Sequence, residues 1–305
     1  MGINIKYYVI SITAIFLSLG IGIFIGFNMN GQDLYLEQQQ ALIDSLEIRF
    51  DEFKTENKDL EQKVENLSAQ NEKQSIFIEN TLKEIVYNKL QGLNVAIVET
   101  TDDYFYTDVR DVLESSGANV PIRIQYTDKI FTVTKEKVAE ISELLQVQLK
   151  TTDDFIYFVN NEITNLLLNK EITEAVNFLI DEEYVVCNIN YNNIEELNIE
   201  NIVMAGGSNE NLENKMEKID VALAKKLSNI GFRVIGVERL DVEQSFISDF
   251  KKINISTVDN IDSRIGQTSL VYIIKGAEGH YGEKSTADSL IPFDSIEQVR
   301  SEDIE

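Results

Sequence analysis

The chain has 305 residues, a formal net charge of −25, one cysteine, one histidine and two prolines. Such an excess of acid argues against nucleic-acid binding and docking on anionic lipid surfaces, since both depend on Lys and Arg. A single cysteine, Cys187, excludes an intrachain disulfide. Its place in the apolar run Tyr-Val-Val-Cys predicts a small core residue.

A continuous apolar stretch near the amino terminus, Tyr7–Met29, contains no charged residue and predicts a membrane-spanning helix. It is longer than the apolar core of a cleaved signal peptide, and no small-residue cleavage site follows it, so we expect an uncleaved anchor. Lys6 precedes the stretch, whereas the first charged residues after it are acidic. The positive-inside rule therefore predicts residues 1–6 in the cytoplasm and the body outside, in a single-pass protein.

Small residues recur at every fourth position inside this stretch, as in helix pairs that approach closely within membranes. They are Ala14, Ser18, Gly22 and Gly26. This spacing predicts a seam for self-association. The alternative is that glycine is simply more frequent in membrane helices.

A heptad repeat covers residues 33–89 and predicts a coiled coil. The a positions hold Ile43, Phe50, Asn57, Val64, Asn71, Ile78 and Ile85, and the d positions hold Leu46, Phe53, Leu60, Leu67, Gln74 and Thr81. Asparagines at a favour one two-stranded register, so Asn57 and Asn71 are expected in a dimer seam. The repeat weakens after Leu67, which leaves open a long amphipathic helix folded back on the globular part.

The charges that flank this seam disfavour a homodimer. In a parallel pair, Arg49 would face Lys54 and Glu56 would face Glu61. Exposed pairs of this kind contribute only a few tenths of a kcal/mol, so they do not forbid a homodimer. They are expected if a second envelope protein with opposite charges competes for the seam.

Residues 92–291 alternate apolar runs with helical patterns, which predicts one α/β domain with a mostly parallel sheet, resembling a Rossmann or flavodoxin-like fold. The expected strands are Leu93–Val98, Val120–Gln125, Tyr184–Ile189, Ile202–Ala205, Arg233–Val237 and Leu270–Ile274. The expected helices are Asp103–Ser115, Lys135–Leu149, Asp154–Ile180, Asn214–Asn229 and Gln244–Lys251. A strand at Ile156–Val159 is an alternative inside the third helix, and residues 292–305 form an acidic tail.

Several segments together resemble the MctB-like family of bacterial envelope proteins, which is labelled copper transport protein. They are the run NIKYYVISITAIFLSLGIGIFIGFNM, the heptad region, the AGGS turn and VDNIDSRIGQTSLVYIIKGAEGHYGEKSTADSLIP. The resemblance covers essentially the whole chain, and Val258–Pro292 is its most specific part. It implies a bacterial cell-membrane protein with a role in copper export or homeostasis. Some relatives resemble a partner protein in envelope assembly at division, in which the coiled coil is the docking element.

The residues themselves give little support for copper binding, so copper enters only through the family label. Copper(I) prefers thiolate and thioether ligands, and copper(II) prefers imidazole. The chain offers Cys187, His280, Met1, Met29, Met204 and Met216, and no two of them lie at motif spacing. His280, in a Gly-His-Tyr-Gly segment expected to be a loop, is the one candidate. A single loop histidine is more often solvated than a ligand.

Enzyme signatures are equally weak. Gly206, Gly207 and Ser208 follow an expected strand and precede an expected helix, where backbone N–H groups can bind an anion. They lack a complete dinucleotide or Walker pattern, and such a turn more often only reverses the chain. Gly276–Lys284 contains His280 and Lys284 beside two glutamates and a tyrosine, without a nucleophile signature. We therefore expect neither an enzyme nor a bound cofactor.

Two function classes remain. The first is a membrane-tethered interaction protein whose coiled coil binds itself or a second envelope protein. The second is a metal-homeostasis component, as the resemblance implies.

Overall fold

The computed structural model describes residues 5–189, 198–210 and 215–292, without the side chains of residues 29–34. Two compact units result, Met1–Ser75 and Ile76–Glu305. The expected acidic tail, apart from Pro292, and the first residue of the helix expected at Asn214 lie outside the described residues.

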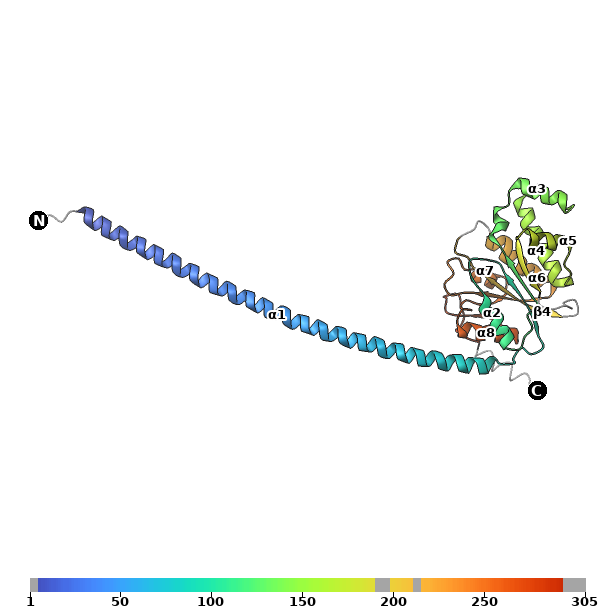
Figure 1. Ribbon diagram of the computed structural model, residues 1–305, viewed down its shortest axis with the longest axis horizontal. Coiled ribbons are helices and arrows are strands. Elements are labelled where there is room, and N and C mark those ends of the chain that lie inside the picture. Colours follow the sequence, from blue (N-terminus) through green and yellow to red (C-terminus); the bar gives the residue numbers. More distant parts are fainter. Residues whose placement is uncertain (1–4, 190–197, 211–214, 293–305) are drawn as a thin grey trace. The chain divides into compact units, whose positions relative to one another are not determined.

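The first unit is part of one unbroken helix, α1, which extends over Ile5–Val86 (Figure 1). The segment Ile5–Asn28 is long and apolar enough to cross a membrane. Every described side chain between residues 5 and 75 is exposed. The expected helical rod is therefore present as a single helix, and its pairing into a coiled coil stays a prediction.

The second unit contains a seven-stranded sheet in the order β3-β2-β1-β4-β5-β6-β7. The strands are β1 Asn94–Glu99, β2 Ile122–Tyr126, β3 Val185–Ile189, β4 Ile199–Gly206, β5 Arg233–Glu238, β6 Ser256–Val258 and β7 His280–Tyr281. All neighbouring pairs are parallel except β2 with β3. The expected mostly parallel α/β sheet is confirmed.

Helices cover both faces of this sheet (Figure 1). One core packs β1 and β2 against α3–α7, and the other packs β1, β4 and β5 against α2, α8 and the end of α1. The helices are α2 Thr107–Ser115, α3 Lys135–Leu144, α4 Thr152–Asn169, α5 Glu174–Asp181, α6 Ala222–Ile230, α7 Ile247–Lys252 and α8 Arg264–Ile274, with the short turn η1 Asp128–Thr132 and the π-helix η3 Met216–Val221. Successive side chains of β1 alternate between the two cores, so this central strand is buried on both faces.

The end of α1 belongs to the second unit. Val86 is buried and Ile85 packs beside it, in the core that also holds α2 and α8. Arg264 of α8 forms an ion pair with Glu79 at 3.4 Å. The described side chains of α1 stay exposed to Ile78 and become partly buried from Glu79 onward, so only the last turns of α1 pack on the domain.

Two expected strands are wrong. Ile156–Val159 lies inside α4, which begins at a capping box in which the Thr151 hydroxyl accepts from the Asp154 N–H at 3.1 Å. Leu270–Ile274 lies inside α8, whose N-cap Ser263 accepts from the Gly266 N–H at 3.0 Å. Both are apolar runs that periodicity alone does not assign between strand and buried helix.

Several helix boundaries also differ from expectation. The helix expected from Asp103 begins at Thr107, and the one expected to reach Leu149 ends at Leu144. The helix expected from Asn214 begins, among the described residues, as the π-helix η3 and continues as α6. The helix expected from Gln244 begins at Ile247.

Candidate functional site

The order in which successive strands are added to the sheet changes direction between β1 and β4, so the two strands form a topological switch point. From β1 it proceeds outward to β2, and from β4 it proceeds the other way to β5 and β6. In open α/β sheets, ligands bind outside the carboxyl ends of the strands at such a point. The residues that follow β1, β4, β5 and β6 are therefore the first place to look for a site.

Three of the buried carboxylates at this edge each have a cation from the same chain. Glu99 at the end of β1 is fully buried and accepts two hydrogen bonds from Arg123, at 2.6 and 2.7 Å. Asp220 of η3 lies 3.5 Å from Lys215 and accepts a short hydrogen bond from the hydroxyl of Thr100. Burial raises the pKa of Asp220, and Lys215 and Thr100 oppose that rise.

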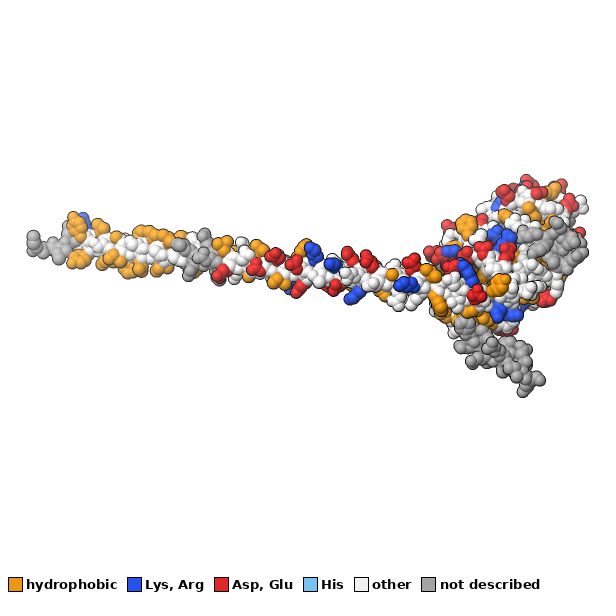
Figure 2. All heavy atoms as spheres, turned by 60° about the horizontal axis from the view of Figure 1, so that its bottom comes forward, with side chains coloured by type: hydrophobic (Ala, Val, Ile, Leu, Met, Phe, Trp, Pro, Cys, Tyr) orange, Lys and Arg blue, Asp and Glu red, His pale blue; other side chains and the backbone are white. Residues whose placement is uncertain are grey.

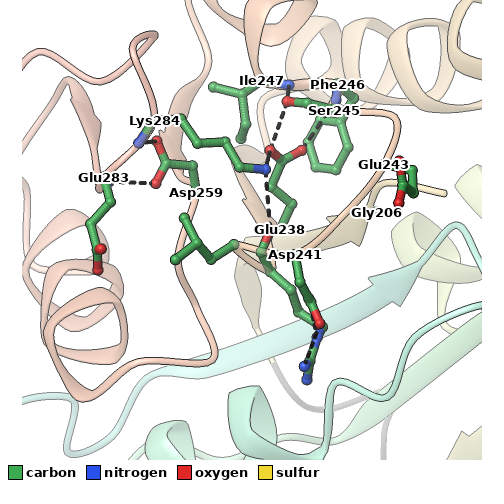
Figure 3. A network of polar contacts seen from close by, with 12 residues as sticks. Gly206, Glu238, Asp241, Glu243, Ser245, Phe246, Ile247, Asp259, Glu283 and Lys284 are labelled. Carbon is green, nitrogen blue, oxygen red and sulfur yellow. Dashed lines mark hydrogen bonds and ion pairs between the residues drawn. The ribbon is translucent and has the colours of Figure 1, made fainter. Parts of the chain in front are cut away.

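The third carboxylate, Glu238, ends β5 and is the centre of the network in Figure 3. Its oxygens accept hydrogen bonds from Lys284 Nζ at 2.5 Å, from Ser245 Oγ at 2.6 Å and from the Phe246 N–H at 3.1 Å. Burial raises the pKa of Glu238, and Lys284 and Ser245 oppose the rise. A buried carboxylate without such partners would be strongly destabilising.

The segment that carries Lys284 is fixed by Asp259, which follows β6. The Asp259 carboxylate accepts from the Glu283 N–H at 2.7 Å and the Lys284 N–H at 3.0 Å. A Cβ at Gly282, where φ is +142°, would lie 1.8 Å from Asp259 Oδ1. Only glycine allows this close approach. The end of the segment Gly276–Lys284 is thus held at the ends of β5 and β6 (Figure 3).

His280 lies in strand β7, so the expectation that it belongs to a loop is wrong. Its Nδ1 is 2.9 Å from the hydroxyl of Thr257 on β6. Burial lowers the pKa of His280, the positive charge of Lys251 lowers it further, and Asp288 opposes the shift. The hydrogen bonds of His280 and of Lys284 are made to different residues, so the two do not act as a pair.

The Gly206-Gly207-Ser208 turn is packed against the segment after β5. A Cβ at Gly206 would lie 2.5 Å from the Phe246 ring, and one at Gly207, where φ is +92°, would lie 2.7 Å from Val242. The Ser208 N–H donates to the Gln244 carbonyl at 3.1 Å. These glycines permit close packing, and their role in binding an anion stays a prediction.

An acidic cluster at this edge was missed from the sequence. Asp102, Asp103 and Asp128 place carboxylate oxygens within 4.8 Å of one another. Burial and the charges of Asp102 and Asp103 raise the pKa of Asp128 to about 6. The available signal was an acidic pair just after the first strand. Carboxylates suit hard cations such as Mg²⁺ or Ca²⁺ better than copper.

The soft ligands are dispersed over the described part of the chain. Cys187 lies on β3, Met204 is buried on β4 and Met216 begins η3. Burial raises the pKa of the Cys187 thiol to about 11, so the thiolate that binds metals is disfavoured at neutral pH. Among the described residues, the acidic cluster is the one place where three or more His, Cys, Asp or Glu side chains lie close enough together to hold a metal ion.

The other candidate surface is helix α1, where apolar side chains and charges are exposed together (Figure 2). The exposed fractions of the a and d side chains lie between 49% and 71% for Ile43, Leu46, Phe50, Phe53, Leu60, Val64 and Leu67. Asn57, Asn71, Arg49, Lys54, Glu56 and Glu61 are exposed as well. Nearer the amino terminus, Ala14, Ser18, Gly22 and Gly26 are exposed, and a Cβ at either glycine would meet nothing within 4 Å.

A family model described as "Copper transport outer membrane protein, MctB" matches residues 2–292. No curated protein matches the chain. The matched region includes the apolar amino-terminal helix, the heptad region and all described elements of the α/β unit. The chain therefore belongs to the MctB family of copper transport outer membrane proteins.

Proposed function

We propose that this chain is a membrane-anchored, non-catalytic component of a copper-related envelope system, in which helix α1 recruits a second envelope protein. Tyr7–Met29 anchors it, with residues 1–6 in the cytoplasm and the body outside. Family membership supports the copper-related setting. The α/β unit serves as the folded body that α1 carries.

The exposed apolar seam of α1 is the observation that carries this proposal. Between Ile43 and Leu67, the apolar a and d side chains are at least 49% exposed in a chain of net charge −25. Burying one such side chain contributes about 1.5–3 kcal/mol. A row of them at heptad spacing is the surface that a second helix covers in a coiled coil.

The charges beside the seam favour a second protein over a second copy. Arg49 and Lys54 would face each other in a parallel homodimer, as would Glu56 and Glu61. A partner with acidic residues opposite the first pair and basic residues opposite the second replaces two repulsions with two attractions. Specificity between related helices depends on such differences.

The pairing of buried carboxylates at the sheet edge supports a non-catalytic role for the α/β unit. Glu99, Asp220 and Glu238 are each neutralised by a cation of the same chain. The Gly206-Gly207 turn is packed under Phe246 and Val242. These three carboxylates are thus engaged in holding the fold.

A matched pair of variants tests the docking surface in the full chain. Phe50→Glu introduces a charge into the seam, whereas Ile48→Glu introduces the same charge at an f position on the far side. Both side chains are exposed, at 71% and 61%, so neither variant disturbs the core. The partner should not co-purify with the Phe50→Glu variant from native membranes, whereas it should co-purify with the Ile48→Glu variant. Equal retention would contradict docking at the seam.

Protease protection tests the topology. Protease added to intact cells without outer layers should digest the body and spare the anchor. Protection of residues 93–305 that is lost on lysis would show the reverse orientation. Fractionation should place the chain in the cell membrane, and recovery in an outer membrane, as the family description states, would contradict the proposed membrane.

Metal titration tests whether the chain itself holds copper. The described soft ligands lie on separate elements, so the purified protein should not bind Cu(I) tightly. A tight stoichiometric complex that Cys187→Ser or His280→Ala abolishes would show that these residues are ligands.

The same exposed seam suits a second candidate function, a scaffold or regulator of envelope assembly at division. Cells that lack the chain separate the two candidates. Copper sensitivity with normal division supports the first function, whereas defective division at unchanged copper tolerance supports the second.

A further inference from the structure

We propose that the occupant of the α1 seam is another membrane-anchored protein, whose helix lies along α1 from the membrane span into the rod. This inference rests on the proposed docking function and specifies the kind of partner. It is carried by the position, direction and continuity of the exposed face on α1.

The apolar face begins close to the membrane. Tyr35 and Leu36 are 70% and 64% exposed, and Leu42 and Ile43 follow at 61% and 54%. Tyr35 is seven residues beyond Asn28, the end of the apolar segment, or about 10 Å along the helix. The headgroup layer is about 5–8 Å deep, so these side chains lie just outside it. A soluble partner on the distal rod alone would leave them in water.

Within this stretch the face is also wider than farther along. Tyr35 and Leu42 occupy g positions beside Leu36 and Ile43 at a, and the d position between them holds Gln39. At Leu42, Ile43 and Leu46, the positions g, a and d are all apolar and the stripe spans about 120° of the helix. Beyond it, the g positions hold Arg49, Glu56 and Lys63, and the stripe narrows to a and d. The broadest apolar contact therefore lies at residues 42–46, in the membrane-proximal part of the rod.

Inside the apolar segment, the same side of α1 carries the small residues Ala14, Ser18 and Gly22, with Ile21 and Ile25 beside them. Ser18 and Leu36 are eighteen residues apart, which is five turns of an α-helix, so they lie on one side. Gly22 lies about 60° from the direction of Ile43. Because α1 is continuous from Ile5, one partner helix can follow this side through both regions. Small residues are the surface that lets a second helix approach closely in lipid.

Charge selects another protein over a second copy as this occupant. The repulsions of Arg49 with Lys54 and of Glu56 with Glu61 arise only in a self-pair. Complementary charges on a different chain remove both. The occupant is therefore a different protein, with an apolar span of its own and a helix that emerges on the same side of the membrane.

Site-specific photocrosslinking in the full chain, expressed in its native membrane, tests the inference. A photoreactive amino acid replaces Ser18 or Ile43 on the proposed side, and Phe16 or Ile48 on the opposite side as controls. Ser18 and Ile43 should yield the same adduct, and mass spectrometry should identify in it a protein with an apolar span of about 20 residues. Phe16 and Ile48 should not yield it.

The alternatives give different patterns. An adduct at Ile43 without one at Ser18 would overturn the shared span and leave the proposed docking function standing. An adduct with a second copy of this chain would also overturn the inference. An adduct at all four positions would show contact without a preferred side, which contradicts it too. No adduct at any position would contradict both the inference and the docking function.

A second variant gives an independent check. Gly22→Leu adds a side chain where the chain itself has nothing within 4 Å of the Cβ, so α1 stays intact. It should abolish the adduct at Ser18 by holding the two helices apart. Full retention of that adduct would overturn a close helix pair at this side of the span.

Discussion

Residues 5–75 of α1 and the α/β unit differ in whether their apolar and charged side chains are exposed or buried. In the α/β unit, strands β1, β4 and β5 are buried between two layers of helices, and the buried carboxylates Glu99, Asp220 and Glu238 each have a cation nearby. In α1, every described side chain to residue 75 is exposed, including the apolar residues at heptad positions. The α/β unit buries its apolar strands within itself, whereas α1 exposes its apolar side chains. The proposed function therefore places recognition on the helix.

The largest effect expected is on the buried ion pair of the α/β unit. Lys284→Met leaves Glu238 buried without its cation, which should lower the free energy of unfolding by about 3–5 kcal/mol. Lys252→Met removes an exposed pair with Asp249 and should change it by less than about 1 kcal/mol. Urea unfolding of the full chain in detergent, followed by tyrosine fluorescence, measures both.

A rescue variant tests whether the loss of stability comes from the unpaired charge of Glu238. Combining Lys284→Met with Glu238→Gln removes the unpaired charge and should recover part of the lost stability. If Lys284→Met lowers the free energy of unfolding no more than Lys252→Met does, the ion pair between Lys284 and Glu238 does not stabilise the fold.

The second prediction compares one leucine in each region. Leu223→Ala, in the core beneath α6, should destabilise the α/β unit by about 2–5 kcal/mol. Leu60→Ala, whose side chain is 49% exposed on α1, should leave that unfolding transition unchanged and reduce capture of the partner. Thermal unfolding and co-purification of the two variants are compared. A lower unfolding temperature for Leu60→Ala would mean that the seam serves the chain's own fold.

Much of the fold follows from the sequence because its central strands are continuous apolar runs. β1, β4 and β5 are predicted within a few residues, since strands buried on both faces carry little else. β6 and β7 were missed because three and two residues give no periodicity. Leu270–Ile274 is predicted as a strand although it is helical, because an apolar run of five residues fits a strand and a buried helix equally well.

The candidate site was less accessible from the sequence. Lys284 stood out in its segment, but its partner Glu238 is far away in the chain and is brought near by the adjacent ends of β5 and β6. Asp128 joins Asp102 and Asp103 because β1 and β2 are parallel neighbours. Spacing along one chain does not reveal contacts that depend on strand order. The heptad spacing of α1 is readable from the sequence because it lies within one helix, and the pairing of that helix stays a prediction.

The third prediction concerns pH and the acidic cluster. The folded pKa of Asp128 is raised to about 6 from an ordinary value of 3.8, so between these values the folded state binds more protons and stability falls as pH rises. Asp128→Asn removes this penalty and should stabilise the protein at pH 7.5 by about 1 kcal/mol, because solvent screens a partly exposed group. The gain should vanish near pH 4.

Urea unfolding at the two pH values measures this difference. Asp111→Asn, on the exposed surface of α2, is the control and should show no such pH dependence. A stabilisation by Asp128→Asn that is equal at both pH values would contradict the proposed titration.

The smallest effect expected is on the flanking charges of α1. Exchanging them by Arg49→Glu with Glu61→Lys relieves two like-charged contacts per chain in a homodimer. It should tighten self-association by about 0.5–1 kcal/mol and weaken capture of the native partner. Sedimentation of the full chain in detergent measures the first effect and co-purification the second. A wild-type chain that is already a tight dimer, and that loosens on the exchange, would indicate a homodimeric stalk.

Complementation of cells that lack the chain tests most directly whether function resides in α1. One variant carries Phe50→Glu and Leu60→Glu in the exposed seam, and the other carries Asp102→Ala and Asp103→Ala at the sheet edge, with equal protein levels verified for both. The seam variant should fail to restore growth in copper, and the edge variant should restore it as the wild type does. Restoration by the seam variant together with failure of the edge variant would place the function in the α/β unit instead.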